Sequence, residues 1–164
     1  MKKSISIFIV LVLLLSVYSV AYATEPQYKS TKALIELLEE YGIKYSIQKV
    51  EFNDEMVNFV DEGDYRKELD IDVAFYDTED EMTLYSFDVI KFSDRDYRDV
   101  LEAVNQLNCT KNYACFYVAE DGVNASWDVY LGETEAKNII DQTVSDFLST
   151  VDEAYHELSK FEKN

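Results

Sequence analysis

The stretch Val100–Leu131, VLEAVNQLNCTKNYACFYVAEDGVNASWDVYL, decides the fold. It begins with apolar residues at helical spacing, which continue to Leu107. Residues 114–118 and 126–131 then alternate apolar and polar side chains, the pattern of half-buried strands. Asp121-Gly122 lies between these two runs, and Asp-Gly is a strong signal for a two-residue type I′ turn. The stretch therefore predicts a helix followed by a β-hairpin with one covered face.

The first residues have the pattern of a secretory signal peptide. Lys2 and Lys3 precede an apolar run from Ile5 to Val17, and Ala21-Tyr22-Ala23 has the small-x-small form of a cleavage site. An uncleaved membrane anchor is the alternative, but the run is shorter than the roughly 20 residues that a spanning helix needs. We expect residues 1–23 to be a signal peptide and residues 24–164 to be a single domain, periplasmic or secreted.

Composition and charge narrow the classes of partner. The chain is 48% hydrophobic and 14% aromatic, so it has the apolar side chains that a disordered acidic tail lacks. The net charge is −18, and without Lys2 and Lys3 it becomes about −20. Such a charge repels phosphate backbones and anionic lipid heads. We therefore expect no nucleic acid partner, no membrane binding after signal cleavage, and attraction to basic proteins.

The apolar periodicity predicts the remaining elements. Met56–Val60 is either a second part of the first strand or a loop packed on the core. The other expected elements are a helix over 31–42, strands over 45–52, 69–77 and 83–92, a helix over 93–107, the hairpin, and a long helix from Gly132 or Thr134 to Leu158. This order, α-β-β-β-α-β-β-α, predicts an α+β fold with a five-stranded antiparallel sheet and helices packed on one face.

That order, with the segment LEAVNQLNCTKNYACFYVAEDG at residues 101–122, resembles the YbjN family, often labelled bacterial sensory transduction regulators. The fold of this family is similar to that of class I type III secretion chaperones. The resemblance covers residues 31–158 and matches buried helix positions to Leu101, Val104 and Leu107 and buried strand positions to Phe116 and Val118. It implies a non-enzymatic protein-binding domain, commonly a homodimer among the chaperones. Those chaperones are cytoplasmic, whereas this chain is expected to be exported.

No residue set points to catalysis, a cofactor or a metal. Nucleophilic catalysis needs a base beside the nucleophile, and the one histidine, His156, follows helical spacing near the chain's end, where a surface position is expected. One histidine and two cysteines do not make a zinc site. The acidic clusters at 61–64 and 77–81 lack the spacing of a calcium loop, so we read them as solvated turns, with calcium binding as the alternative. We expect no enzymatic activity.

Cys109 and Cys115 flank the link between the second helix and the hairpin. In an exported protein an even cysteine count favours a disulfide, and their spacing is compatible with bridging distance. Two reduced thiols are the main alternative. A redox role is disfavoured because the pair lacks C-x-x-C spacing.

The tyrosines suggest a binding surface. Tyr76, Tyr113, Tyr117 and Tyr130 are expected on the sheet face opposite the helices. If that face is open, it offers the contact area that protein partners use, since tyrosine contributes much area for little entropy. The alternatives are a face covered by residues 45–60 or by dimerisation.

Two functions remain as expectations. The first is an exported domain that binds a protein partner, in a possibly regulatory role of the kind that the family resemblance implies. The second is an exported acidic inhibitor or immunity-type protein that blocks a basic enzyme. A hydrolase of unfamiliar type is a weaker third.

Overall fold

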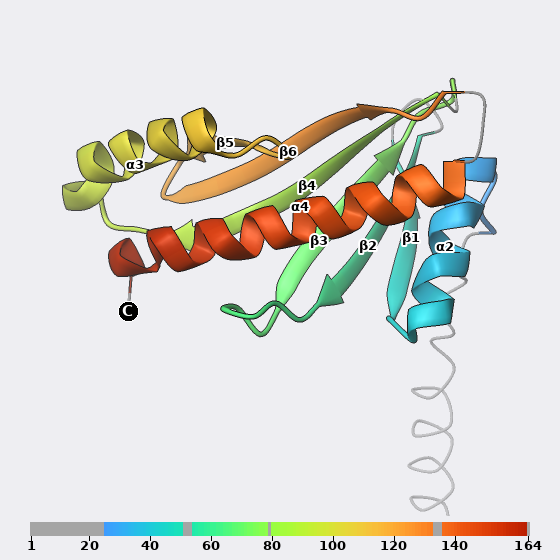
Figure 1. Ribbon diagram of the computed structural model, residues 1–164, viewed down its shortest axis with the longest axis horizontal. Helices are drawn as coiled ribbons and strands as arrows, with labels where there is room; N and C mark the ends of the chain where they lie inside the picture. The colour runs from blue at the N-terminus through green and yellow to red at the C-terminus, as the bar shows by residue number, and fades with distance from the viewer. Residues whose placement is uncertain (1–24, 51–53, 79, 133–135, 164) are drawn as a thin grey trace, which may run out of the picture.

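The computed structural model describes residues 25–50, 54–78, 80–132 and 136–163, so the expected signal peptide lies outside the described residues. The helices are α2 (Lys29–Tyr41), α3 (Tyr97–Thr110) and α4 (Ala136–Leu158), with short 3-10 turns η2 (Asp94–Asp96) and η3 (Ser159–Phe161). The strands are β1 (Tyr45–Lys49), β2 (Glu55–Asp61), β3 (Leu69–Phe75), β4 (Glu81–Lys91), β5 (Cys115–Ala119) and β6 (Gly122–Tyr130). Figure 1 shows α4 lying across the sheet with α2 beside one of its ends.

The strands form one antiparallel sheet in the order β1-β2-β3-β4-β6-β5. The α+β class and the antiparallel sheet are confirmed, but the sheet has six strands rather than five and four of them precede α3. The missed strand is β2, which contains Met56–Val60. It was ambiguous because both of its faces carry apolar residues; Val57 and Phe59 pair opposite Val73 and Ile71 on the buried side.

Buried side chains from α2, α3, α4 and the sheet form one hydrophobic cluster. The apolar stripe of α4, in which residues repeat at alternating intervals of four and three, contributes fully buried Ile140, Phe147 and Val151. In α3 the buried stripe is Val100, Val104 and Leu107, whereas Leu101, expected to be buried, is 39% exposed because it lies off that stripe. Among the described residues, the buried members of this cluster run from Tyr28 to Leu158.

The predicted hairpin is present, but its turn lies one residue earlier than expected. Ala119 pairs with Gly122, so Glu120 and Asp121 form the loop, and Glu120 takes the positive φ of 53°. Gly122 is the first residue of β6 and lies close to the Asp88 carboxylate, which would have to move to admit a Cβ at this position. Asp88 also has a positive φ, 52°, and lies where the β4–β6 register shifts between Ser86 and Ile90.

The loop between β2 and β3 is fastened to α4 by a buried carboxylate. Asp152 of α4 accepts hydrogen bonds from Tyr65 N (3.0 Å) and Arg66 N (2.8 Å). Gly63 packs against the same carboxylate, where a Cβ would not fit. From this loop the Arg66 guanidinium donates to Asp88 O (3.1 Å) and Val89 O (2.8 Å) at the β4 bulge. The Asp152 carboxylate thus joins α4 to the loop, and the Arg66 guanidinium joins the loop to the irregular part of β4.

Candidate partner-binding surfaces

The sheet face opposite the core is called here the open face. Its exposed apolar side chains include Phe87 (48% exposed), Tyr117 (37%) and Tyr130 (67%). Residues 45–49 and 55–61 are strands of the sheet itself, so they do not cover it. By alternation from the buried positions, the open face carries Met56, Asn58, Val60, Asp70, Asp72, Thr83, Tyr85, Phe87, Tyr117, Asn124, Ser126, Asp128 and Tyr130.

Aromatic and acidic side chains meet at one end of this face. Tyr76 and Tyr130 line a hollow of about 520 Å³ together with Glu81, Thr83 and Asp128. Thr83 Oγ1 donates to Asp128 Oδ1 (2.7 Å), and the Tyr76 hydroxyl therefore donates to Thr83 Oγ1 (2.9 Å). The hydroxyls and carboxylates in this hollow are suited to accept hydrogen bonds from a lysine or arginine side chain.

Tyr85 lies near this network and was not among the predicted surface residues. Burial, the larger cause, and a hydrogen bond with Tyr76 together raise the pKa of Tyr85 to about 12. Its hydroxyl is therefore neutral at physiological pH. Its ring stacks on Phe87 with centroids 5.7 Å apart. Strict alternation along residues 83–92 would place Tyr85, Phe87 and Val89 on one face, but Val89 is fully buried because the bulge at Asp88 reverses the alternation.

The other two predicted tyrosines are separated from this hollow. Tyr117 lies on the edge strand β5, opposite Asn124, and shares the open face. Tyr113 precedes β5 and contacts Trp127, with ring centroids 5.3 Å apart. Trp127 pairs with buried Leu84 and packs against the core, so Tyr113 does not join the others on the open face.

The predicted disulfide is not formed in the structure: Cys109 and Cys115 are free, exposed thiols. The link between α3 and β5 is instead fastened by Asn108. Its side-chain amide donates to Phe116 O (2.8 Å) and accepts from Phe116 N (2.7 Å). The amide therefore occupies the N–H and C=O of Phe116, two of the backbone groups that the edge strand β5 would otherwise offer to another strand.

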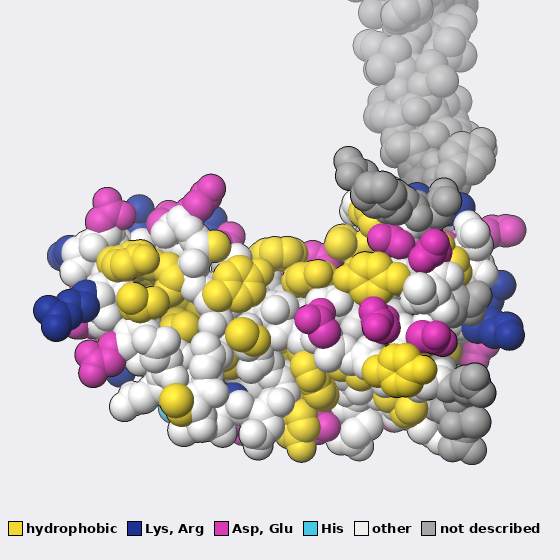
Figure 2. Space-filling model, turned by 90° about the horizontal axis from the view of Figure 1, so that it is seen from above, with side chains coloured by type: hydrophobic (Ala, Val, Ile, Leu, Met, Phe, Trp, Pro, Cys, Tyr) yellow, Lys and Arg dark blue, Asp and Glu magenta, His cyan; other side chains and the backbone are white. Residues whose placement is uncertain are grey.

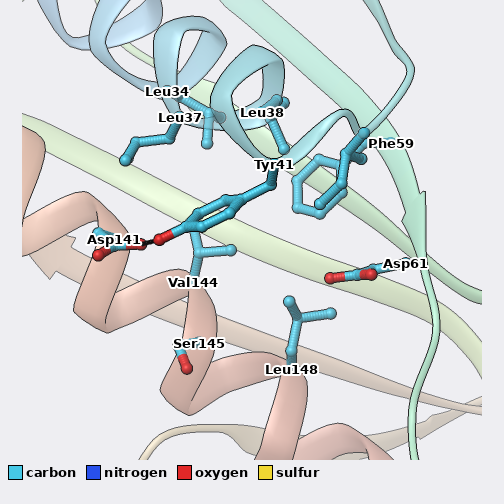
Figure 3. Close-up of a pocket in the computed structure, with 11 residues that line it drawn as sticks. Leu34, Leu37, Leu38, Tyr41, Phe59, Asp61, Asp141, Val144, Ser145 and Leu148 are labelled. Carbon is cyan, nitrogen blue, oxygen red and sulfur yellow. Dashed lines mark hydrogen bonds between the residues drawn. The ribbon is translucent and has the colours of Figure 1, made fainter.

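A pocket lies on the helix side of the sheet, between α2, β2 and α4 (Figure 3). Its volume is about 390 Å³, and leucine side chains of α2, Phe59 and Leu148 form its apolar wall. Asp61, which the sequence placed in an acidic turn, lies at this pocket. No sequence motif pointed to the pocket, because its residues come from three segments that each resembled ordinary core.

The remaining sequence candidates are dispersed. His156 is exposed in the last turn of α4, as expected, and stacks on Tyr65 with centroids 4.1 Å apart. In the described ranges, no three His, Cys, Asp or Glu side chains are grouped to hold a metal ion. Glu79 of the second acidic cluster lies outside those ranges. None of the helices in the described part is long and apolar enough to cross a membrane.

No protein-family model matches the chain, and a search of curated proteins found no significant match.

Proposed function

We propose that the chain is an exported, non-enzymatic protein-binding domain of the YbjN and type III secretion chaperone-like type, and that it recognises a basic protein on its open face. The observation that carries the proposal is the charge pattern of that face. Asp70, Asp72 and Asp128 accompany its aromatic side chains, whereas Lys91 is the only lysine or arginine that the described strands direct to it. Lys91 is itself paired with Asp88, at 3.0 Å.

The rest of the surface supports a basic partner. The net charge of −18 attracts cationic proteins over a distance of about a Debye length, roughly 8 Å at physiological salt. On the side of the molecule that Figure 2 shows, hydrophobic and acidic side chains are intermixed and most lysines and arginines lie towards the two ends. An interface of this kind gains contact area from the aromatics and orientation from the carboxylates.

A second candidate is an exported acidic inhibitor or immunity-type protein that acts on a basic enzyme. The hollow between Tyr76 and Tyr130 favours it, because Glu81 and Asp128 lie there beside aromatic rings that can receive a projecting arginine or lysine. Both candidates use the same face. They differ in their effect on the bound protein, since only an inhibitor abolishes the activity of its partner.

The test is a pull-down with residues 24–164 from the cells that produce the protein, with the solution mass measured in parallel. A face variant replaces Phe87, Tyr117 and Tyr130 by alanine. A control variant replaces the similarly exposed Tyr65, Tyr97 and Leu101, which lie off the open face.

We expect one basic protein to be retained by the wild type and by the control, and at least tenfold less of it by the face variant. A strict monomer that captures nothing would contradict the proposal. So would a dimer that the face variant dissociates, because the face would then serve a second copy of the chain. If the captured protein is an enzyme that the wild type inhibits and the face variant does not, the inhibitor reading is favoured.

A further inference from the structure

The pocket between α2, β2 and α4 has the dimensions and lining of a small-molecule site. Its volume of about 390 Å³ falls in the range of roughly 300 to 1,000 Å³ typical of ligand pockets. Leu34 and Leu38 of α2 and Phe59 of β2 are almost completely buried, and Val144 and Leu148 of α4 complete the apolar wall. The pocket is built by the helices and by the buried side of the sheet, so it is separate from the open face.

The polar side chains of Tyr41, Asp61 and Asp141 also line this pocket. Figure 3 shows Tyr41 extending from α2 towards α4, with Asp141 at its hydroxyl and Asp61 on the other side of its ring. The Tyr41 hydroxyl donates to Asp141 Oδ1 (3.1 Å), and this hydrogen bond is the main reason that the pKa of Tyr41 is raised. Asp61 Oδ1 accepts from the backbone N–H of Glu62 (2.8 Å).

Within the part of the chain that the structure describes, these two carboxylates form no ion pair. Lys137, one turn before Asp141, is paired instead with Glu40 at 2.7 Å and Glu36 at 3.6 Å. An apolar cavity with two uncompensated carboxylates at its lining is complementary to a molecule that is apolar with one positive end.

We propose that this pocket binds a small amphiphilic amine. The apolar part of the ligand lies between Leu38, Phe59 and Leu148. Its ammonium group lies near the ring of Tyr41, within reach of Asp61 and Asp141, where both ion pairing and a cation–π contact stabilise it. A carboxylate or phosphate of the same shape is repelled by both aspartates and by the overall charge of −18.

The proposal is tested by titrating residues 24–164 with three probes that share one apolar group: 4-phenylbutylamine, 4-phenylbutan-1-ol and 5-phenylpentanoate. Isothermal calorimetry measures the affinity, and amide chemical shifts locate the site. We expect the amine to bind at least tenfold more tightly than the alcohol and the carboxylate not to bind. The shift changes should map to α2, β2 and α4.

Two variants separate charge from shape. Changing both Asp61 and Asp141 to Asn should weaken amine binding about tenfold, the size expected from the loss of two partly exposed ion pairs, and leave alcohol binding unchanged. Ser145→Trp places a large side chain at the pocket from an exposed position on α4, so it should abolish binding of both probes. Gln142→Trp is exposed on the same helix outside the pocket and is the control.

An amine that binds no tighter than the alcohol, or equal amine binding by the wild type and the Ser145→Trp variant, would overturn the proposal. Retention of amine binding by the open-face variant is expected, because that variant leaves the pocket intact. The outcome is therefore independent of whether a protein partner is found for the open face.

Discussion

Replacing Asp152 by alanine is expected to destabilise the protein by about 3 kcal/mol. Asp152 is only 5% exposed, and its carboxylate accepts hydrogen bonds from the backbone N–H groups of Tyr65 and Arg66. A hydrogen bond to a charged group contributes about 1.5 to 3 kcal/mol, and the lower end applies because water can reach the two partly buried N–H groups once the carboxylate is gone. For a domain of this size the melting temperature should fall by about 10 °C.

The assay is urea denaturation of residues 24–164, followed by the fluorescence of Trp127. This is the single tryptophan, and it lies on β6, remote in sequence from the substitution, so it reports global unfolding. Asp146→Ala on the same helix is the control, because its carboxylate interacts with the exposed Gln142 side chain (2.9 Å) and its loss should change stability by at most about 0.5 kcal/mol.

A double-mutant cycle with Gly63 tests the geometry itself. A methyl group at position 63 would collide with the Asp152 carboxylate, so Gly63→Ala should cost about 2 kcal/mol in the wild type. In the Asp152→Ala background the collision is absent and the cost should nearly vanish. A loss below about 1 kcal/mol for Asp152→Ala, or an equal cost of Gly63→Ala in both backgrounds, would refute the reasoning.

Three further predictions concern the open face and the edge of the sheet. Asn108→Ala removes both hydrogen bonds to Phe116, so it should lower the free energy of unfolding by about 2 kcal/mol and promote self-association through β5. Light scattering at increasing protein concentration detects the association, and a monomer at every concentration would contradict the argument that Asn108 protects this edge. Burial raises the pKa of Asp72, although the Asn58 hydrogen bond opposes this, so the charged form of Asp72 is disfavoured in the folded state. Asp72→Asn should therefore raise the free energy of unfolding by about 0.5 kcal/mol at pH 7, after allowance for solvent screening. Urea titrations should show this gain disappearing below about pH 4, and a gain that persists there would exclude a titration effect. Tyr85 should ionise near pH 12 in an ultraviolet titration, and the stability of the protein should fall as the pH rises from about 10. Tyr85→Phe should lack the ionisation step near pH 12; an unchanged titration curve in this variant would assign the step to another group.

The hairpin shows how far local sequence rules reach. Its two strands and their pairing follow from alternation over residues 114–131, and both are present. The turn itself was misplaced, because Gly122 begins β6 without a positive φ, in close approach to the Asp88 carboxylate. That approach depends on a bulge in β4, a contact between distant segments that turn propensity does not include.

The same bulge explains the errors in the candidate surface. Strict alternation would group Tyr85 and Phe87 with buried Val89, so it does not identify these two aromatics as part of the open face. Tyr76, directly after β3, and Tyr130, at the end of β6, line the same hollow. Tyr113 does not join them, because it precedes β5 and contacts Trp127 instead.

The pocket was beyond sequence reasoning for a different reason. Leu38, Phe59 and Leu148 each fit the apolar pattern of their own element, and nothing local indicates that they leave a space where the elements meet. The one available signal was polar. Tyr41 and Asp141 lie beside the apolar stripes of their helices, and only the fold brings them within hydrogen-bonding distance.

The location of the partner on the open face is tested most directly by chemical footprinting. Nitration of exposed tyrosines, read by mass spectrometry, compares residues 24–164 alone with the complex formed with the captured protein. The account predicts that Tyr117 and Tyr130 become protected in the complex while Tyr65 and Tyr97 react as before. Protection of Tyr65 or Tyr97 with Tyr117 and Tyr130 still reactive would contradict it.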